Sequence, residues 1–132
     1  MRRLVTAAAA VLVMLTDAGA STQVAHEIEG LYDCVGMNPD GSEYRGTVEL
    51  TRGDDGVFAF HWTFPPGGEA YGLGLLKGDV LSVVFQTQDG AIGLAQLTID
   101  RATGLRLLGP WLAPGAPGLG SETLTKRGQV PA

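Results

Sequence analysis

Among the side chains of this sequence that could carry out chemistry, Glu122 is the most informative charged residue. Glu122 alternates with Gly120 and Leu124 in the last apolar-patterned segment. If Leu124 faces a core, Glu122 points inward near one end of the fold, where a carboxyl group must be hydrogen-bonded or have a raised pKa. If that segment is an exposed edge, Glu122 is simply solvated. Both alternatives remain open from the sequence.

Cys34 is the single cysteine, so an intramolecular disulfide is impossible. It shares the parity of Tyr32, so the two side chains point to the same side of an extended segment. A buried cysteine is usually an inert, small apolar residue, and no basic residue nearby indicates a nucleophile.

The two histidines, His26 and His61, have no spacing that is typical of a metal site. His61 lies between Phe60 and Trp62, so it points to solvent if the aromatic side chains point inward. The aspartates that could suggest calcium stand beside turn residues and lack the spacing of an EF-hand loop: Asp40, Asp54, Asp55, Asp79 and Asp89. We therefore expect no metal and no other cofactor.

These side chains must be positioned by short strands, because turn residues divide the sequence at regular intervals. Clusters of Gly, Pro, Asn and Asp occur at 38–41, 53–56, 65–68, 77–79, 88–90, 101–104 and 114–118. Apolar residues alternate with polar ones between the clusters, as in Phe58-x-Phe60-x-Trp62-x-Phe64. Short connections make neighbouring strands antiparallel, and closure removes exposed edges. The sequence predicts an all-β, eight-stranded antiparallel up-and-down barrel, with a two-sheet sandwich as the alternative.

The interior of such a barrel is expected to be rich in aromatic side chains. The predicted buried core comprises Phe58, Phe60, Trp62, Phe85 and Trp111. An eight-stranded barrel is just wide enough to be filled by side chains or to hold one small ligand. Glycines inside the strands leave space that these aromatic residues can occupy. We predict a mostly filled barrel with at most a shallow cavity at one mouth, whose ligand-binding residues are Glu122, Tyr44, Tyr71, Trp62 and Trp111.

The first twenty residues predict export from the cytoplasm. Arg2 and Arg3 precede an apolar run at 4–15, and Ala18-Gly19-Ala20 fits a cleavage site before Ser21. A membrane-spanning helix would need about 20 apolar residues, more than this run provides. The expected division is a helical signal peptide at 1–20, a flexible segment at 21–28, one barrel domain at 29–127 and a disordered tail at 128–132.

The order of turn and core residues resembles that of a known family. The matching elements are Gly30-x-Tyr32, Asn38-Pro39-Asp40-Gly41-Ser42-x-Tyr44-x-Gly46, Trp62, Gly72-x-Gly74, Leu81-x-Val83, Leu107-x-Gly109-x-Trp111 and Gly120-x-Glu122-x-Leu124. Together they resemble an uncharacterised bacterial secreted β domain that is sometimes labelled fibronectin-binding. The resemblance spans about residues 29–125 and implies a fold rather than an activity. The architecture is more distantly similar to avidin and lipocalin barrels, and a fold does not fix a function.

The net charge of the chain restricts the kinds of partner that it is expected to bind. The formal net charge is −5, and it becomes more negative once the two arginines and one aspartate of 1–20 are removed. An acidic domain is a poor candidate for binding nucleic acid or an anionic membrane, so neither is expected as a partner. The sequence favours a secreted or periplasmic, non-enzymatic binding module for a small molecule or an extracellular protein. The alternative is a small-barrel enzyme that uses Glu122 with a tyrosine.

Overall fold

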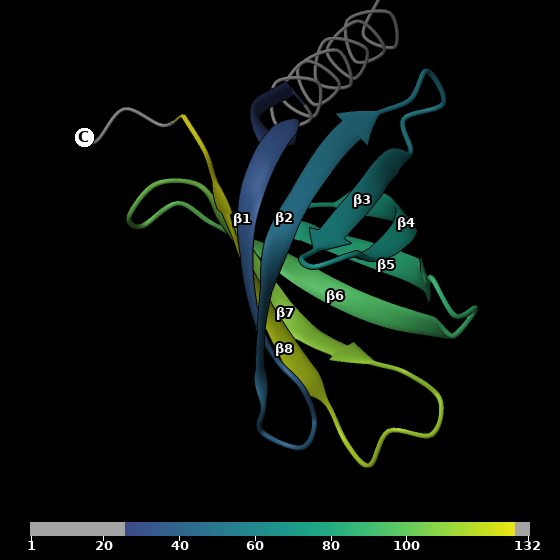
Figure 1. The fold of residues 1–132 in the computed structure, drawn as a ribbon. Coiled ribbons are helices and arrows are strands. Elements are labelled where there is room, and N and C mark those ends of the chain that lie inside the picture. The colour runs from purple at the N-terminus through teal and green to yellow at the C-terminus, as the bar shows by residue number, and fades with distance from the viewer. Residues whose placement is uncertain (1–25, 129–132) are drawn as a thin grey trace, which may run out of the picture.

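The chain forms one closed barrel of eight antiparallel strands (Figure 1) in a computed structural model that describes residues 26–128. The strands are β1 (Gly30–Met37), β2 (Glu43–Arg52), β3 (Phe58–Phe64), β4 (Gly68–Lys77), β5 (Val80–Thr87), β6 (Ile92–Asp100), β7 (Arg106–Leu112) and β8 (Gly120–Lys126). Each strand pairs with its neighbours in sequence, and β1 pairs with β8 to complete the cylinder. The predicted up-and-down barrel is confirmed. The expected signal peptide lies outside the described residues.

Alternation along the strands separates the barrel interior from its outer surface. Every second residue of β1 and of β6 is buried, and the buried positions are mainly apolar. Phe58, Phe60 and Trp62 of β3 are almost fully buried, while Phe85 and Trp111 are partly buried and pack against the same core. The predicted aromatic core is therefore confirmed, with two of its members lying nearer to a mouth of the barrel.

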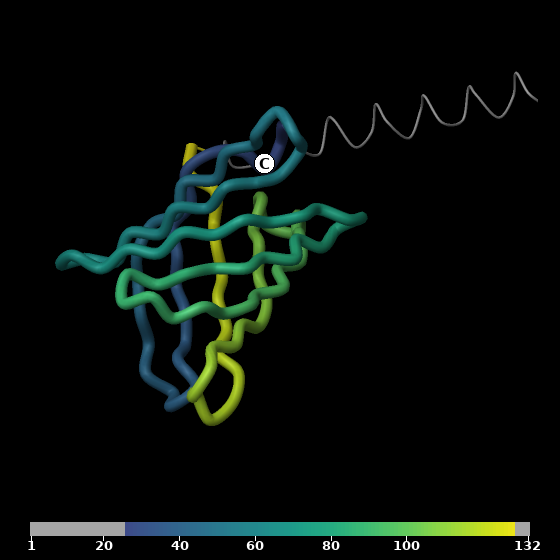
Figure 2. Tube along the Cα trace, turned by 90° about the vertical axis from the view of Figure 1, so that its right-hand side faces the viewer, coloured from purple at the N-terminus to yellow at the C-terminus, as the bar shows by residue number. Residues whose placement is uncertain are grey.

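The barrel has two distinct ends. Figure 2 shows β4 and β5 running steeply across the direction of β1 and β8, as the tilt of strands in a closed barrel requires. We call the end formed by the β1–β2, β3–β4, β5–β6 and β7–β8 connections the open end. The opposite end, formed by the other three connections and by residues 26–29, is the closed end.

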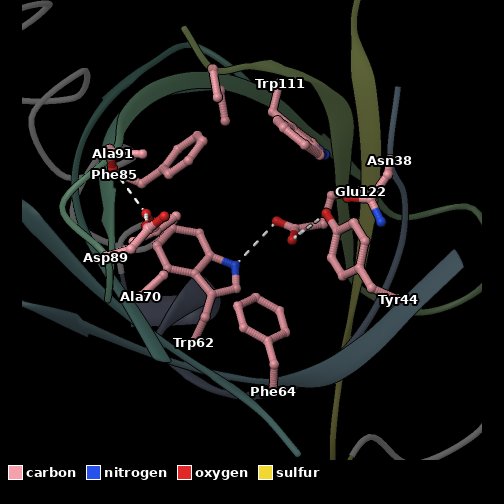
Figure 3. Close-up of a pocket in the computed structure, with 13 residues that line it drawn as sticks. Asn38, Tyr44, Trp62, Phe64, Ala70, Phe85, Asp89, Ala91, Trp111 and Glu122 are labelled. Carbon is pink, nitrogen blue, oxygen red and sulfur yellow. Dashed lines mark hydrogen bonds between the residues drawn. The ribbon is translucent and has the colours of Figure 1, made fainter. Parts of the chain in front are cut away.

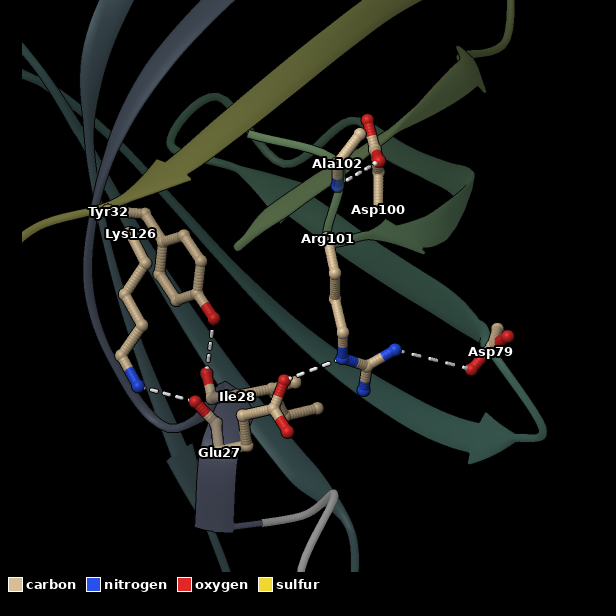
Figure 4. Close-up of polar contacts among 8 residues, drawn as sticks. All are labelled: Glu27, Ile28, Tyr32, Asp79, Asp100, Arg101, Ala102 and Lys126. Atoms are coloured by element: carbon tan, nitrogen blue, oxygen red, sulfur yellow. Dashed lines mark hydrogen bonds and ion pairs between the residues drawn. The ribbon is translucent and has the colours of Figure 1, made fainter. Parts of the chain in front are cut away.

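Residues 26–28 form a helical turn that caps the closed end (Figure 4). Ile28 is fully buried, and its carbonyl oxygen accepts a 2.5 Å hydrogen bond from the Tyr32 hydroxyl. Arg101 Nε donates to Glu27 at 2.7 Å, and Lys126 Nζ donates to the Glu27 carbonyl oxygen. These three residues were expected within a flexible segment. Of these three, Ile28 is buried in the core, whereas His26 and Glu27 are exposed and Glu27 bonds to Arg101 and Lys126.

The outer surface carries an apolar row across four strands. Leu73, Val84, Leu94 and Leu112 face one another in register from β4 to β7, and each is between 42 % and 56 % exposed. This outer row lies on the opposite side of the barrel wall from the interior.

Among the described residues, no helix is long and apolar enough to cross a bilayer.

Candidate ligand-binding cavity

Six side chains from five strands meet inside the open end of the barrel. They are Tyr44 of β2, Trp62 and Phe64 of β3, Phe85 of β5, Trp111 of β7 and Glu122 of β8. Figure 3 shows Glu122 among Tyr44, Trp62 and Trp111, with Phe64 and Phe85 completing the ring. Each of them is inward because of its parity within its strand.

Glycines on the neighbouring strands make room for these aromatic rings. Three cavity residues face a glycine directly across a strand pair: Gly36–Tyr44, Gly93–Phe85 and Gly120–Trp111. A Cβ atom built on Gly120 would lie 2.2 Å from Cε2 of Trp111, which is far inside van der Waals contact. The missing side chain therefore lets the indole lie flat against β8.

The aromatic rings contact one another in a continuous series around the cavity. Trp62 meets Phe85 at a centroid distance of 6.1 Å, and Phe85 meets Trp111 at 6.2 Å. Tyr44 continues the series, 6.3 Å from Trp111 and 5.7 Å from Phe64. All four contacts are edge-to-face, an arrangement favoured by the ring quadrupoles. The series gives the cavity rigid apolar walls.

Glu122 lies at the base of this cavity and accepts three hydrogen bonds. Its Oε1 accepts from Cys34 Sγ and from the Tyr44 hydroxyl, each at 3.1 Å, and its Oε2 accepts from Trp62 Nε1 at 3.2 Å. Only 7 % of Glu122 is exposed, and no other charged residue is buried in the part of the chain that the structure describes. The inward alternative for Glu122 is therefore the one the structure adopts.

Burial raises the pKa of Glu122, and the hydrogen bonds from Cys34, Trp62 and Tyr44 oppose that shift. Burial, followed by the charge of Glu122, also raises the pKa of Cys34 and of Tyr44. Both groups consequently keep their protons at neutral pH and act as donors to the carboxyl. Cys34 is buried, as its parity predicted, and it is not activated as a nucleophile.

The indole N–H of Trp111 is buried without a hydrogen-bond partner. The Tyr44 hydroxyl is close enough to interact with it but does not complete a hydrogen bond. An unpaired buried donor is unfavourable by about 1–3 kcal/mol. An acceptor in the cavity would remove this cost.

The cavity itself has a volume of about 390 Å³ and opens between the turns of the open end. It reaches the buried residues Trp62, Ala70, Ala95 and Glu122, so it is deeper than the shallow depression expected from the sequence. The difference has a physical cause, because the aromatic rings pack against the glycine positions on the wall and leave the axis of the barrel open. The half of the barrel toward the closed end is filled by residues such as Tyr32, Leu81 and Leu107.

Four of the five predicted ligand-binding residues line the cavity: Tyr44, Trp62, Trp111 and Glu122. Tyr71 does not, and its assignment to the interior was wrong. It is 56 % exposed and stacks on His61 at 4.5 Å on the outer surface. Tyr71 pairs with His61 across β3 and β4. Tyr71 alternates with Ala70 and Gly72, and His61 alternates with Phe60 and Trp62, so both point outward. His61 is outward as expected, with Nε2 3.3 Å from Glu69 Oε1.

Sequence reasoning did not nominate the residues that form the rim and part of the wall. Phe64 continues the inward parity of Trp62, so its pattern could have identified it. Asn38, Asp89, Ala91 and Ala113 come from the connections at the open end and Thr87 from the last position of β5, and only the closed topology brings them together. Within residues 26–128 no group of three or more His, Cys, Asp or Glu side chains is arranged to hold a metal ion.

No protein-family model matches the chain, and no curated protein matches it in sequence. Several solved structures share its fold. The redesigned β-barrel mFAP1, solved bound to DFHBI, superposes with a TM-score of 0.65 at 17 % identity, covering 77 % of this chain and 97 % of the other. The redesigned barrel b11L5F_LGL gives 0.64 at 17 % identity, covering 78 % and 94 %. A fluorescence-activating barrel designed de novo gives 0.62 at 19 % identity, covering 78 % and 96 %. These similarities establish that the chain has the fold of a small, closed β-barrel.

Proposed function

We propose that this protein is a non-enzymatic binding protein whose barrel holds one small, largely apolar molecule at its open end. The observation that carries the proposal is the cavity of about 390 Å³ with aromatic walls and a buried carboxyl at its base. Small-molecule sites usually have volumes of about 300–1,000 Å³, apolar walls and a few convergent polar groups. Barrels of the same fold have been solved with the small molecule DFHBI bound, which supports the proposal by analogy of architecture.

The test has two stages. Protein purified without denaturation is extracted with organic solvent, and any co-purifying molecule is identified by mass spectrometry. Binding of the identified molecule, or of hits from a small-molecule library, is then measured by isothermal titration calorimetry. Calorimetry is preferred to a fluorescent-dye melt because the outer apolar row would also attract such a dye.

Two substitutions at adjacent positions locate the binding site. Ala95 lines the cavity, whereas Leu94 belongs to the outer row. Ala95→Phe should fill the cavity and weaken binding by at least about tenfold, equivalent to about 1.4 kcal/mol. Leu94→Gln should leave the affinity unchanged. Loss of binding in the Leu94 variant alone would place the ligand on the outer surface and contradict the proposal.

One observation favours a second candidate, a small-barrel enzyme. The Tyr44 hydroxyl is 3.1 Å from Glu122 Oε1, which is hydrogen-bonding distance for a proton-transfer pair. The two functions differ in the fate of the bound molecule. Recovery of the ligand unchanged after prolonged incubation supports a binding protein, whereas conversion that stops in Tyr44→Phe supports the enzyme.

We also propose that the protein acts outside the cytoplasm, because residues 1–20 carry the pattern of a signal peptide. Protein recovered from the extracytoplasmic fraction should begin at Ser21, since Ala18 and Ala20 are the small residues that signal peptidase requires. Sequencing of the N-terminus tests this prediction. Exported protein that still begins at Met1 would contradict it.

A further inference from the structure

We propose that the ligand is a small organic cation, a protonated amine joined to an apolar and preferably aromatic body. This inference rests on the proposed function and specifies the chemistry of the same cavity. It follows from the charge of the lining residues, the hydrogen-bond capacity of Glu122 and the arrangement of the aromatic rings.

The charged residues that line the cavity are all acidic. Glu122 lies at the base and Asp89 at the rim, and neither lysine nor arginine is among the lining residues. A carboxylate or phosphate ligand would bring its charge against Glu122 with no lining cation to compensate it. A cationic ligand would meet two carboxyl groups in sequence, first in solvent at the rim and then in a poorly solvated interior, where attraction between charges is stronger.

Glu122 has capacity for one further donor. A carboxylate offers about four acceptor positions, and Cys34, Tyr44 and Trp62 occupy three of them. An ammonium N–H can take the remaining position. Hydrogen bonds between ionised groups are about twice as strong as neutral ones, so the amine would also hold Glu122 in its charged form.

The aromatic walls suit the rest of such a ligand. A cation within about 6 Å of a ring centroid is attracted by the ring face, and five aromatic rings surround the space above Glu122: Tyr44, Trp62, Phe64, Phe85 and Trp111. The same walls accept an apolar body. An oxygen acceptor on the ligand could also pair with the unpartnered N–H of Trp111.

The experiment compares three probes that share a naphthalene ring and have similar size but differ in charge. Naphthalen-2-ylmethanamine is cationic, naphthalen-2-ylmethanol is neutral and naphthalene-2-carboxylate is anionic at neutral pH. Titration calorimetry with the purified protein should give the amine an affinity at least about tenfold above that of the alcohol, with the carboxylate the weakest. Glu122→Gln should remove the preference, so that the amine binds with no more than about threefold the affinity of the alcohol in that variant.

Glu49→Gln is the matched control, because it removes the same charge from an exposed position on β2. It should leave the preference intact. A second measurement needs no variant: in the unaltered protein the amine-to-alcohol affinity ratio should rise with pH as Glu122 ionises. Cys34 and Tyr44, which face Glu122, stay neutral over the pH range in which Glu122 ionises. Asp89 is ionised throughout the same pH range.

Each outcome distinguishes this inference from the proposed function. Equal binding of amine and alcohol, or a preference for the carboxylate, overturns the cationic ligand but leaves a small-molecule cavity. A preference that survives Glu122→Gln and does not vary with pH also overturns it. If no probe binds, the cationic inference fails for aromatic amines, and the proposed function is then decided separately by the molecule extracted from native protein.

Discussion

Trp62→Ala is expected to lower the free energy of unfolding by roughly 3–5 kcal/mol, the range for large-to-small substitutions of buried aromatic residues. Trp62 is only 4 % exposed, stacks on Phe60 at 5.2 Å and contacts Phe85 edge-to-face. Its removal would extend the existing cavity toward the core. It would also remove the indole donor from Glu122 Oε2, so the loss combines packing with a broken buried hydrogen bond.

Tyr71→Ala is the control for this substitution. Tyr71 is also an aromatic residue in a strand, but it lies on the outer surface, where it stacks on His61. Its truncation should cost no more than about 1 kcal/mol. Denaturant-induced unfolding of both variants provides the measurement. A loss below about 1 kcal/mol for Trp62→Ala would contradict the packing described for β3.

The fold could be predicted because its signals are local. Turn residues recur between short segments, and parity within each segment decides which side chains face inward, as for Phe58, Phe60 and Trp62. Parity also placed His61 outside and Cys34 inside. The misassignment of Tyr71 shows the limit of this reasoning. The segment at 68–77 contains three glycines and several leucines, so either parity looks apolar until Ala70 pairs with Trp62 across the strands.

The depth of the cavity could not be predicted, because it depends on contacts between strands that are distant in sequence. Glu122 of β8 meets Cys34 of β1, Tyr44 of β2 and Trp62 of β3 only after the cylinder closes. The glycines were recognised as space for aromatic rings, but the sequence does not reveal which ring uses which glycine. The register gives that answer: Trp111 takes the space at Gly120, which leaves the axis above Glu122 open.

The burial of Glu122 predicts that the stability of the protein depends on pH. Burial raises the pKa of Glu122 in the folded protein above its ordinary value of 4.5. At a pH between the unfolded-state pKa and the raised folded-state pKa, Glu122 is protonated in the folded protein and ionised in the unfolded chain. The contribution of Glu122 to the free energy of unfolding should therefore be full below about pH 4.5 and be lost as the pH rises through the folded-state pKa, with a slope approaching about 1.4 kcal/mol per pH unit between the unfolded-state and folded-state pKa values.

Four aspartates at or near the surface affect stability in a more acidic pH window than Glu122 and with the opposite sign. The side chain of Arg127 holds the pKa of Asp33 below its usual 3.8, so the stability that this pair contributes is lost as the pH falls below that range. Asp33 and the other aspartates with lowered pKa values, Asp40, Asp89 and Asp100, thus act at more acidic pH than Glu122. A single measurement of the free energy of unfolding against pH therefore separates the effect of these aspartates from that of Glu122.

Glu122→Gln isolates the contribution of the buried carboxyl, because glutamine keeps the shape of the side chain and cannot ionise. Unfolding of the ligand-free protein and of the variant by denaturant, from about pH 4.5 to about pH 8, should show the decline in the unaltered protein and its loss in the variant. Glu49→Gln, which changes an exposed carboxyl, should retain the decline. Subtracting the free energy of unfolding of Glu122→Gln from that of the unaltered protein at each pH removes the contributions of the titratable groups that both proteins share. A difference that does not vary with pH would mean that three donors compensate fully for burial, and that Glu122 is already ionised in the empty barrel.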